Sequence, residues 1–147
     1  MIVYLAAPID FAAGSDITLA KDSIKKHFQE QECVWVYDPA GAWNAPHDLI
    51  PDETVHWSNL RVLEAADILV AVLLKHTLTI GTVLEIQHAV DHNIPVIVIG
   101  NIGINSVALA ALEVPTYESI RDWSEDGSPI VPIVNAHRPS TNQSLRR

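Results

Sequence analysis

The chain has 147 residues and carries a formal net charge of −9. This charge argues against a nucleic-acid polymer or an anionic membrane surface as the main partner, because both require clustered Lys and Arg. Hydrophobic residues make up 48% of the chain, which is ordinary for a globular protein, and the apolar runs are far too short to span a membrane.

The first residues, MIVYLAAPID, have no basic segment before the apolar run, so we expect no signal peptide. Cys33 is the only cysteine, which excludes an internal disulfide and fits a reducing, cytoplasmic environment.

Short apolar runs alternate with segments of helical periodicity. In chain order we expect a strand at 1–7, a helix at 15–31, a strand at 33–37, a loop at 38–51, a helix at 51–66, a strand at 67–74, a helix at 79–93 and a strand at 94–100. Two helical or mixed pieces follow at 106–114 and 116–123. We expect Cys33 to begin a buried strand, Trp35 and Trp57 to lie in the core, and Trp123 to be a packing or interface residue.

This alternation predicts an α/β fold with a single domain over residues 1–125, followed by an irregular tail over 126–147. The sheet should be parallel and Rossmann- or flavodoxin-like, with helices on both faces. Ligands bind such sheets beyond the carboxyl ends of the strands, so we expect the site on the loops at 8–14, 38–51, 75–80 and 100–106.

Several common motifs are absent from the sequence. There is no G-x-G-x-x-G, no G-x-x-x-x-G-K-[ST] and no G-x-S-x-G, so the sequence indicates neither a dinucleotide or P-loop site nor a serine-hydrolase nucleophile. We expect no cofactor.

The segment TIGTVLEIQHAV places Glu85 in a helix that we expect to begin near Ile80 or Gly81. About one turn into a helix, the macrodipole favours an ionised carboxylate, which is the form a nucleophile needs. Gly81 would let a ligand approach the backbone closely. On these residues alone, a glutamate that only complements the dipole is the simpler interpretation.

Glu85, His88 and His92 recur at i, i+3 and i+7, which places them on one helix face. A metal site could use this spacing, but the sequence assigns no further ligand. We therefore expect a polar helix flank and no metal. His47 and His56 are expected in loops or on the surface.

Several segments together resemble the nucleoside 2-deoxyribosyltransferase family, including its relatives that hydrolyse nucleoside 5'-monophosphates. The matching segments, from Met1 to about Ser119, are IVYLAAPI with Tyr4, VYDPAGAW, LRVLEAADILVAVLL, the spacing Thr79-x-Gly81-x-x-x-Glu85, and IPVIVIG. The resemblance implies that Glu85 is a nucleophile that forms a covalent glycosyl-enzyme and that Tyr4 positions it. It also implies substrate contacts from Gly81 and from Pro8 in the loop after the first strand. Packing at the end of a strand is an equally good interpretation of Tyr4.

Three positions either depart from the family pattern or carry residues that differ between its transferases and its hydrolases. Asn59 stands where the family often has an aspartate near the reacting sugar, and an amide cannot exchange a proton at neutral pH. Thr79 stands where the nucleoside transferases have an aspartate, which favours a 5'-phosphate because a hydroxyl can donate to it. Asp10 stands where animal hydrolases have an arginine, and its charge would repel a phosphate.

Asn105 matches the family residue that reaches the 5' end of the sugar from a neighbouring subunit, and a helix N-cap is an equally good interpretation. The functional interpretation implies shared active sites and therefore a homo-oligomer of at least two chains. Trp43 is the candidate for stacking on the base, because it lies among small residues of the 38–51 loop.

The leading hypothesis is an enzyme that cleaves the N-glycosidic bond of a (2'-deoxy)nucleoside through Glu85 and transfers the sugar to another nucleobase. A nucleoside 5'-monophosphate N-glycosidase that releases free base is the first alternative. A nucleotide-binding protein with weak or no turnover is the second, and Asn59 motivates it.

Overall fold

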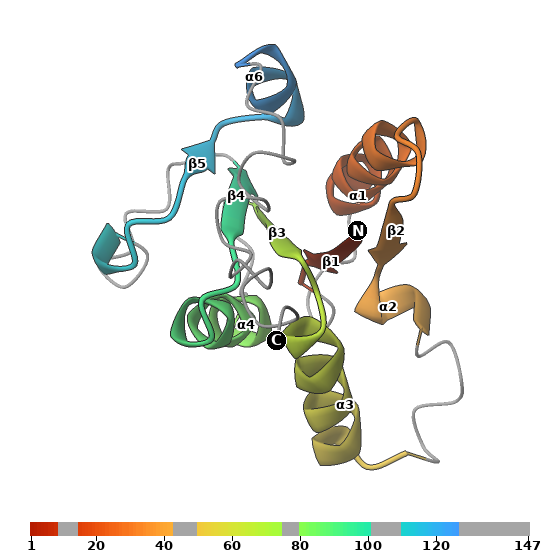
Figure 1. The fold of residues 1–147 in the computed structure, drawn as a ribbon, viewed down its shortest axis with the longest axis vertical. Coiled ribbons are helices and arrows are strands. Elements are labelled where there is room, and N and C mark those ends of the chain that lie inside the picture. The colour runs from red at the N-terminus through yellow and green to blue at the C-terminus, as the bar shows by residue number, and fades with distance from the viewer. Residues whose placement is uncertain (9–14, 43–49, 75–79, 101–109, 127–147) are drawn as a thin grey trace, which may run out of the picture.

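The computed structural model describes residues 1–8, 15–42, 50–74, 80–100 and 110–126 (Figure 1). The strands are β1 Ile2–Ala6, β2 Trp35–Tyr37, β3 Ile68–Leu73, β4 Val96–Gly100 and β5 Thr116–Tyr117. The helices are α1 Ser15–Gln29, α2 Pro39–Ala42, α3 Asp52–Glu64, α4 Ile80–Asp91 and α6 Ile120–Glu125. Within the described residues, no helix combines the length and apolar character needed to cross a membrane.

The strands form one parallel sheet of five strands in the order β2-β1-β3-β4-β5. The central strand β3 is buried along its whole length, as its unbroken apolar run predicts. This order is that of flavodoxin-like sheets, in which the direction of strand addition reverses between β1 and β3. The crevice beyond the carboxyl ends of these two strands is therefore where a ligand is expected.

Helices cover both faces of the sheet, as expected from the alternation of strands and helices (Figure 1). On one face, Val3 and Leu5 of β1 pack with apolar residues of α1 and with Trp123 of α6. On the other face, Tyr4 and Ala6 pack with apolar residues of α3 and α4. Because side chains alternate along a strand, this division sends the Tyr4 side chain toward α3 and α4.

Asp67, the residue just before β3, joins the amino ends of the two central strands. Its carboxylate accepts a hydrogen bond of 2.7 Å from the backbone N–H of Ile2, and its own N–H donates to the Ile2 carbonyl at 2.9 Å. Pairing then continues in register, with Tyr4 opposite Leu69. Asp67 therefore has a structural role, because it sets how far along β3 the side chain of Tyr4 lies.

Strand β4 requires a glycine at its last position, Gly100, because a neighbouring strand lies too close for a side chain. A Cβ at Gly100 would lie 1.7 Å from the carbonyl oxygen of Leu73, the residue paired with it on β3. A side chain there would force the carboxyl ends of β3 and β4 apart.

Three expectations about the core are wrong. Cys33 is exposed and lies in a turn with a φ of 62°, just before β2 begins. Trp35 is 55% exposed because β2 is a short edge strand and its pattern of burial is irregular. Trp57 is 63% exposed because the N-terminal part of α3 extends away from the sheet (Figure 1). Trp123 is a packing residue, only 2% exposed.

The loop expected at 38–51 begins with the short helix α2, which the sequence analysis did not predict. The backbone carbonyl of Asp38 accepts from the N–H groups of Gly41 and Ala42, which closes this single turn. The irregular tail expected from Asp126 lies outside the described residues from 127 onward.

Candidate active site

Glu85 and Tyr4 meet on the α3 and α4 side of the sheet. Tyr4 lies on β1, and Glu85 lies on α4, the helix that follows β3. The Tyr4 hydroxyl donates a hydrogen bond to Glu85 Oε1 at 2.6 Å, and the bond is buried. This length is that of a charge-assisted O–H···O⁻ hydrogen bond, which is about twice as strong as a neutral one. The structure therefore brings together two of the residues that the resemblance assigns to catalysis.

Burial decides the acidity of Glu85. The side chain is 9% exposed, and loss of hydration raises the pKa of this carboxyl to about 7, while the hydrogen bond from Tyr4 lowers the pKa in part. We expected the helix dipole to favour the ionised form of Glu85, but burial has the larger effect on its pKa. Because α4 begins at Ile80, Glu85 is its sixth residue and lies beyond the first turn, where the dipole acts.

Tyr4 remains a hydrogen-bond donor throughout the physiological range. Burial raises the pKa of its hydroxyl far above the ordinary value, and the neighbouring charge of Glu85 raises the pKa further. The tyrosine therefore stabilises the ionised form of Glu85 without exchanging a proton with it at neutral pH.

Tyr37 connects this pair to Asn59, and sequence reasoning did not single it out. It stands opposite Tyr4 in the pairing of β1 and β2, and the two ring centroids are 5.5 Å apart. Its hydroxyl donates to Asn59 Oδ1 at 3.1 Å, and Asn59 is buried in α3. Tyr37 could have been found in VYDPAGAW, because it is an aromatic residue at the carboxyl end of β2, the strand beside β1. The Tyr4–Glu85 and Tyr37–Asn59 hydrogen bonds are therefore neighbours, joined through the packed rings of the two tyrosines.

Asp38 holds the start of the following loop in place. Its carboxylate pairs with Lys21 at 2.8 Å and Lys25 at 2.6 Å, both on α1, and accepts from the N–H of Ala40 at 3.1 Å. Burial would raise the pKa of Asp38, but the hydrogen bonds and charges of the two lysines outweigh it and hold the pKa below its ordinary value. The segment after β2, which leads toward Trp43, is thus fixed to α1.

The remaining predicted residues are only partly placed. Pro8 is buried just after β1. Gly81 is exposed in the first turn of α4, and a Cβ there would meet no atom within 4 Å, so packing does not explain this glycine. The other four, Asp10, Trp43, Thr79 and Asn105, lie outside the described residues.

We predict that Glu85→Gln stabilises the protein at pH 8. Raising a carboxyl pKa from 4.5 to about 7 disfavours the ionised form by about 3 kcal/mol, at about 1.4 kcal/mol for each tenfold change. Because the folded-state pKa is the higher one, the protonated carboxyl contributes stability that is complete below pH 4.5 and lost as pH rises through about 7. Gln is neutral, and its amide oxygen can still accept from Tyr4.

Urea unfolding followed by tryptophan fluorescence measures this difference. The variant should exceed the wild type by up to about 3 kcal/mol at pH 8 and match it at pH 4.5. Glu53→Gln, which removes an exposed carboxylate of α3, is the control and should change stability little at either pH. A Glu85→Gln protein that is less stable than the wild type at pH 8 would contradict the account of this carboxyl.

Comparisons with known proteins bear on the fold. No protein-family model matches the sequence, and a search of curated proteins found no match. A 2-deoxyribosyltransferase structure from Bacillus psychrosaccharolyticus superposes with a TM-score of 0.72 at 15% identity, covering 91% of this chain and 96% of that one. A conserved protein from Enterococcus faecalis V583 gives 0.68 at 16% identity, covering 84% and 94%. A 2-deoxyribosyltransferase from Leishmania mexicana gives 0.51 at 16% identity, covering 68% and 64%. The chain thus has the fold of 2-deoxyribosyltransferase structures, which confirms at the level of the fold the resemblance seen in its sequence.

Proposed function

We propose that the protein cleaves the N-glycosidic bond of a (2'-deoxy)nucleoside through Glu85 and transfers the sugar to another nucleobase. The observation that carries this proposal is the buried hydrogen bond of 2.6 Å between Tyr4 and Glu85. It lies beside the strand pair at which sheets of this order bind ligands. The fold shared with two 2-deoxyribosyltransferase structures supports the choice of reaction.

In the first step, Glu85 displaces the base. Tyr4 bonds Oε1, and we assign the attack on the anomeric carbon to Oε2. The new C–O bond forms an ester with the sugar, and the electrons of the C–N bond leave with the base. A carboxylate beside the sugar also stabilises the positive charge that develops on the ring in such reactions. With a pKa of about 7, a large fraction of Glu85 is ionised at neutral pH.

In the second step, a ring nitrogen of another base attacks the same carbon, expels Glu85 as a carboxylate and loses its N–H proton to solvent. Two displacements at one carbon return the original configuration, as in retaining glycosidases. The departing base needs a proton, which the amide of Asn59 cannot supply at neutral pH. We propose that Asn59 acts through hydrogen bonding and that the proton comes from solvent.

The direct test mixes the protein with a deoxynucleoside and a different free base, and measures the exchanged nucleoside by chromatography. The wild type should form it, and Glu85→Gln should lower the rate by about 1000-fold or more, because the nucleophile is lost. Glu53→Gln makes the same substitution at an exposed glutamate of α3 and should retain activity. Folded wild-type protein that forms no exchanged nucleoside with any base would exclude the transferase proposal.

The same assay distinguishes the alternatives. Release of free base from a 5'-monophosphate without an acceptor would favour the hydrolase, to which Thr79 points and against which Asp10 argues. Binding measured by calorimetry without base release, and unchanged in Glu85→Ala, would favour a binding protein. A site shared between subunits through Asn105 remains a prediction from the sequence.

We predict that Tyr4→Phe shifts the pH dependence of activity. Removing the hydrogen bond that lowers the pKa of Glu85 should raise this pKa from about 7 by roughly one further unit. Since the ionised form reacts, the rising limb of the rate profile should move to higher pH, and the rate at pH 7 should fall about fivefold.

Tyr37→Phe is the matched control for this shift, because the hydroxyl that it removes donates to Asn59, whereas that of Tyr4 donates to Glu85. It should leave the position of the rising limb unchanged. A Tyr4→Phe enzyme whose limb coincides with that of the wild type would show that this hydrogen bond does not set the ionisation of Glu85.

A further inference from the structure

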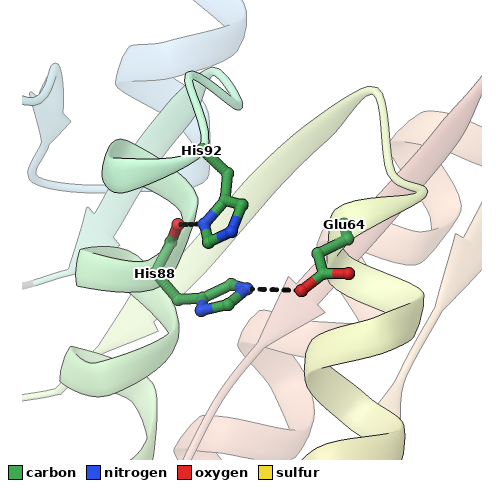
Figure 2. Close-up of side chains that lie close together, drawn as sticks. All are labelled: Glu64, His88 and His92. Carbon is green, nitrogen blue, oxygen red and sulfur yellow. Dashed lines mark hydrogen bonds and ion pairs between the residues drawn. The ribbon is translucent and has the colours of Figure 1, made fainter.

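Three possible metal ligands from two helices converge on the surface beside α4. Glu64 is the last residue of α3, His88 lies in the last turn of α4, and His92 follows the end of that helix. One ligand atom from each lies within 4.8 Å of the other two. Figure 2 shows both imidazole rings on the side of α4 that faces Glu64. The spacing of the histidines was visible in the sequence, but Glu64 is the third ligand that only the fold supplies.

One hydrogen bond orients the His92 ring for coordination, and another holds the His88 ring beside Glu64. His88 Nε2 lies 3.2 Å from Glu64 Oε1. His92 Nδ1 lies 2.8 Å from the carbonyl oxygen of His88. Because a carbonyl can only accept, Nδ1 of His92 carries the proton and its Nε2 presents a lone pair. A backbone carbonyl that holds the second ring nitrogen is the usual support of a metal-binding histidine.

We propose that Glu64, His88 and His92 bind a divalent cation of the zinc class. Two imidazole nitrogens and one carboxylate oxygen suit zinc and its borderline neighbours, whereas calcium and magnesium prefer more numerous oxygen ligands. Tetrahedral bonds of about 2.0–2.1 Å place neighbouring ligand atoms about 3.3 Å apart. His88 Nε2 and Glu64 Oε1 are 3.2 Å apart, and the ion would replace the proton between them. The ligand atoms all lie within 4.8 Å of one another, so the other separations would need only a small side-chain adjustment. Water would complete the coordination.

An ion pair between His88 and Glu64 alone does not explain why the His92 ring lies beside them. The two imidazole rings are stacked with centroids 4.0 Å apart and an interplanar angle of 27°. The stack places the two imidazoles side by side, so that one ion could be shared between them and Glu64. The side chains of His88 and Glu64 are 19% and 41% exposed, so an ion can reach them from solvent.

A bound cation would join the end of α3 to the end of α4. Asn59 lies on the first of these helices and Glu85 on the second, so the cation would brace the two elements that hold the candidate active site. The proposal itself rests on the three side chains and not on the proposed function, and its test requires no nucleoside.

Calorimetric titration of the chelator-treated full chain with zinc chloride tests the proposal, and cobalt absorption provides a second readout of coordination. The wild type should bind one zinc ion per chain, and its melting temperature should rise with zinc. His92→Gln and Glu64→Gln should each weaken binding by more than about 100-fold, since losing even an outer-shell partner of a metal ligand costs about 10–100-fold. Both substitutions are at exposed positions, and circular dichroism checks that the variants fold.

His56→Gln is the matched control, because His56 is an exposed histidine on α3 outside the cluster. It should bind zinc as the wild type does. Absence of saturable zinc binding by the wild type would overturn the proposal. Equal affinities in the wild type, His92→Gln and Glu64→Gln would overturn it too, because zinc would then bind elsewhere.

Discussion

The candidate site depends on a carboxylate that is removed from water and accepts a hydrogen bond from Tyr4. Burial makes ionisation of Glu85 costly, and the hydrogen bond from Tyr4 recovers part of that cost. The sheet provides this contact. Asp67 aligns β1 with β3, and alternation along β1 directs the tyrosine to the face that α4 covers. If Tyr4 were one residue earlier or later, its side chain would point to the opposite face.

Such a carboxylate suits the proposed reaction. A poorly hydrated Glu85 loses little solvation when it attacks the sugar, and its pKa of about 7 leaves it partly ionised at neutral pH. On this account the buried carboxylate costs stability above neutral pH, a cost of the kind found where activity needs a destabilised group. Tyr37, whose ring packs against that of Tyr4, holds Asn59 through a second hydrogen bond. The proposal assigns them to positioning and hydrogen bonding and assigns no proton transfer to either.

Much of the fold could be predicted from the sequence, because its signals are local. The unbroken apolar run of β3 and the start of α4 at Ile80 both follow from nearby residues. Properties that depend on distant partners could not be predicted. The dipole argument for Glu85 failed because it took no account of burial in the folded chain, which raises the pKa of this carboxyl. Glu64 could not be paired with the histidines before the packing of α3 against α4 was known.

The central claim is that Glu85 forms a covalent bond with the sugar. Intact-protein mass spectrometry, after brief incubation with a deoxynucleoside and acid quenching, tests it most directly. The account predicts a wild-type species heavier by one deoxyribosyl group, with the modified peptide containing Glu85, and no such species in Glu85→Gln. Rapid formation of the exchanged nucleoside by the wild type with the adduct on another residue, or with the same adduct in Glu85→Gln, would contradict the account.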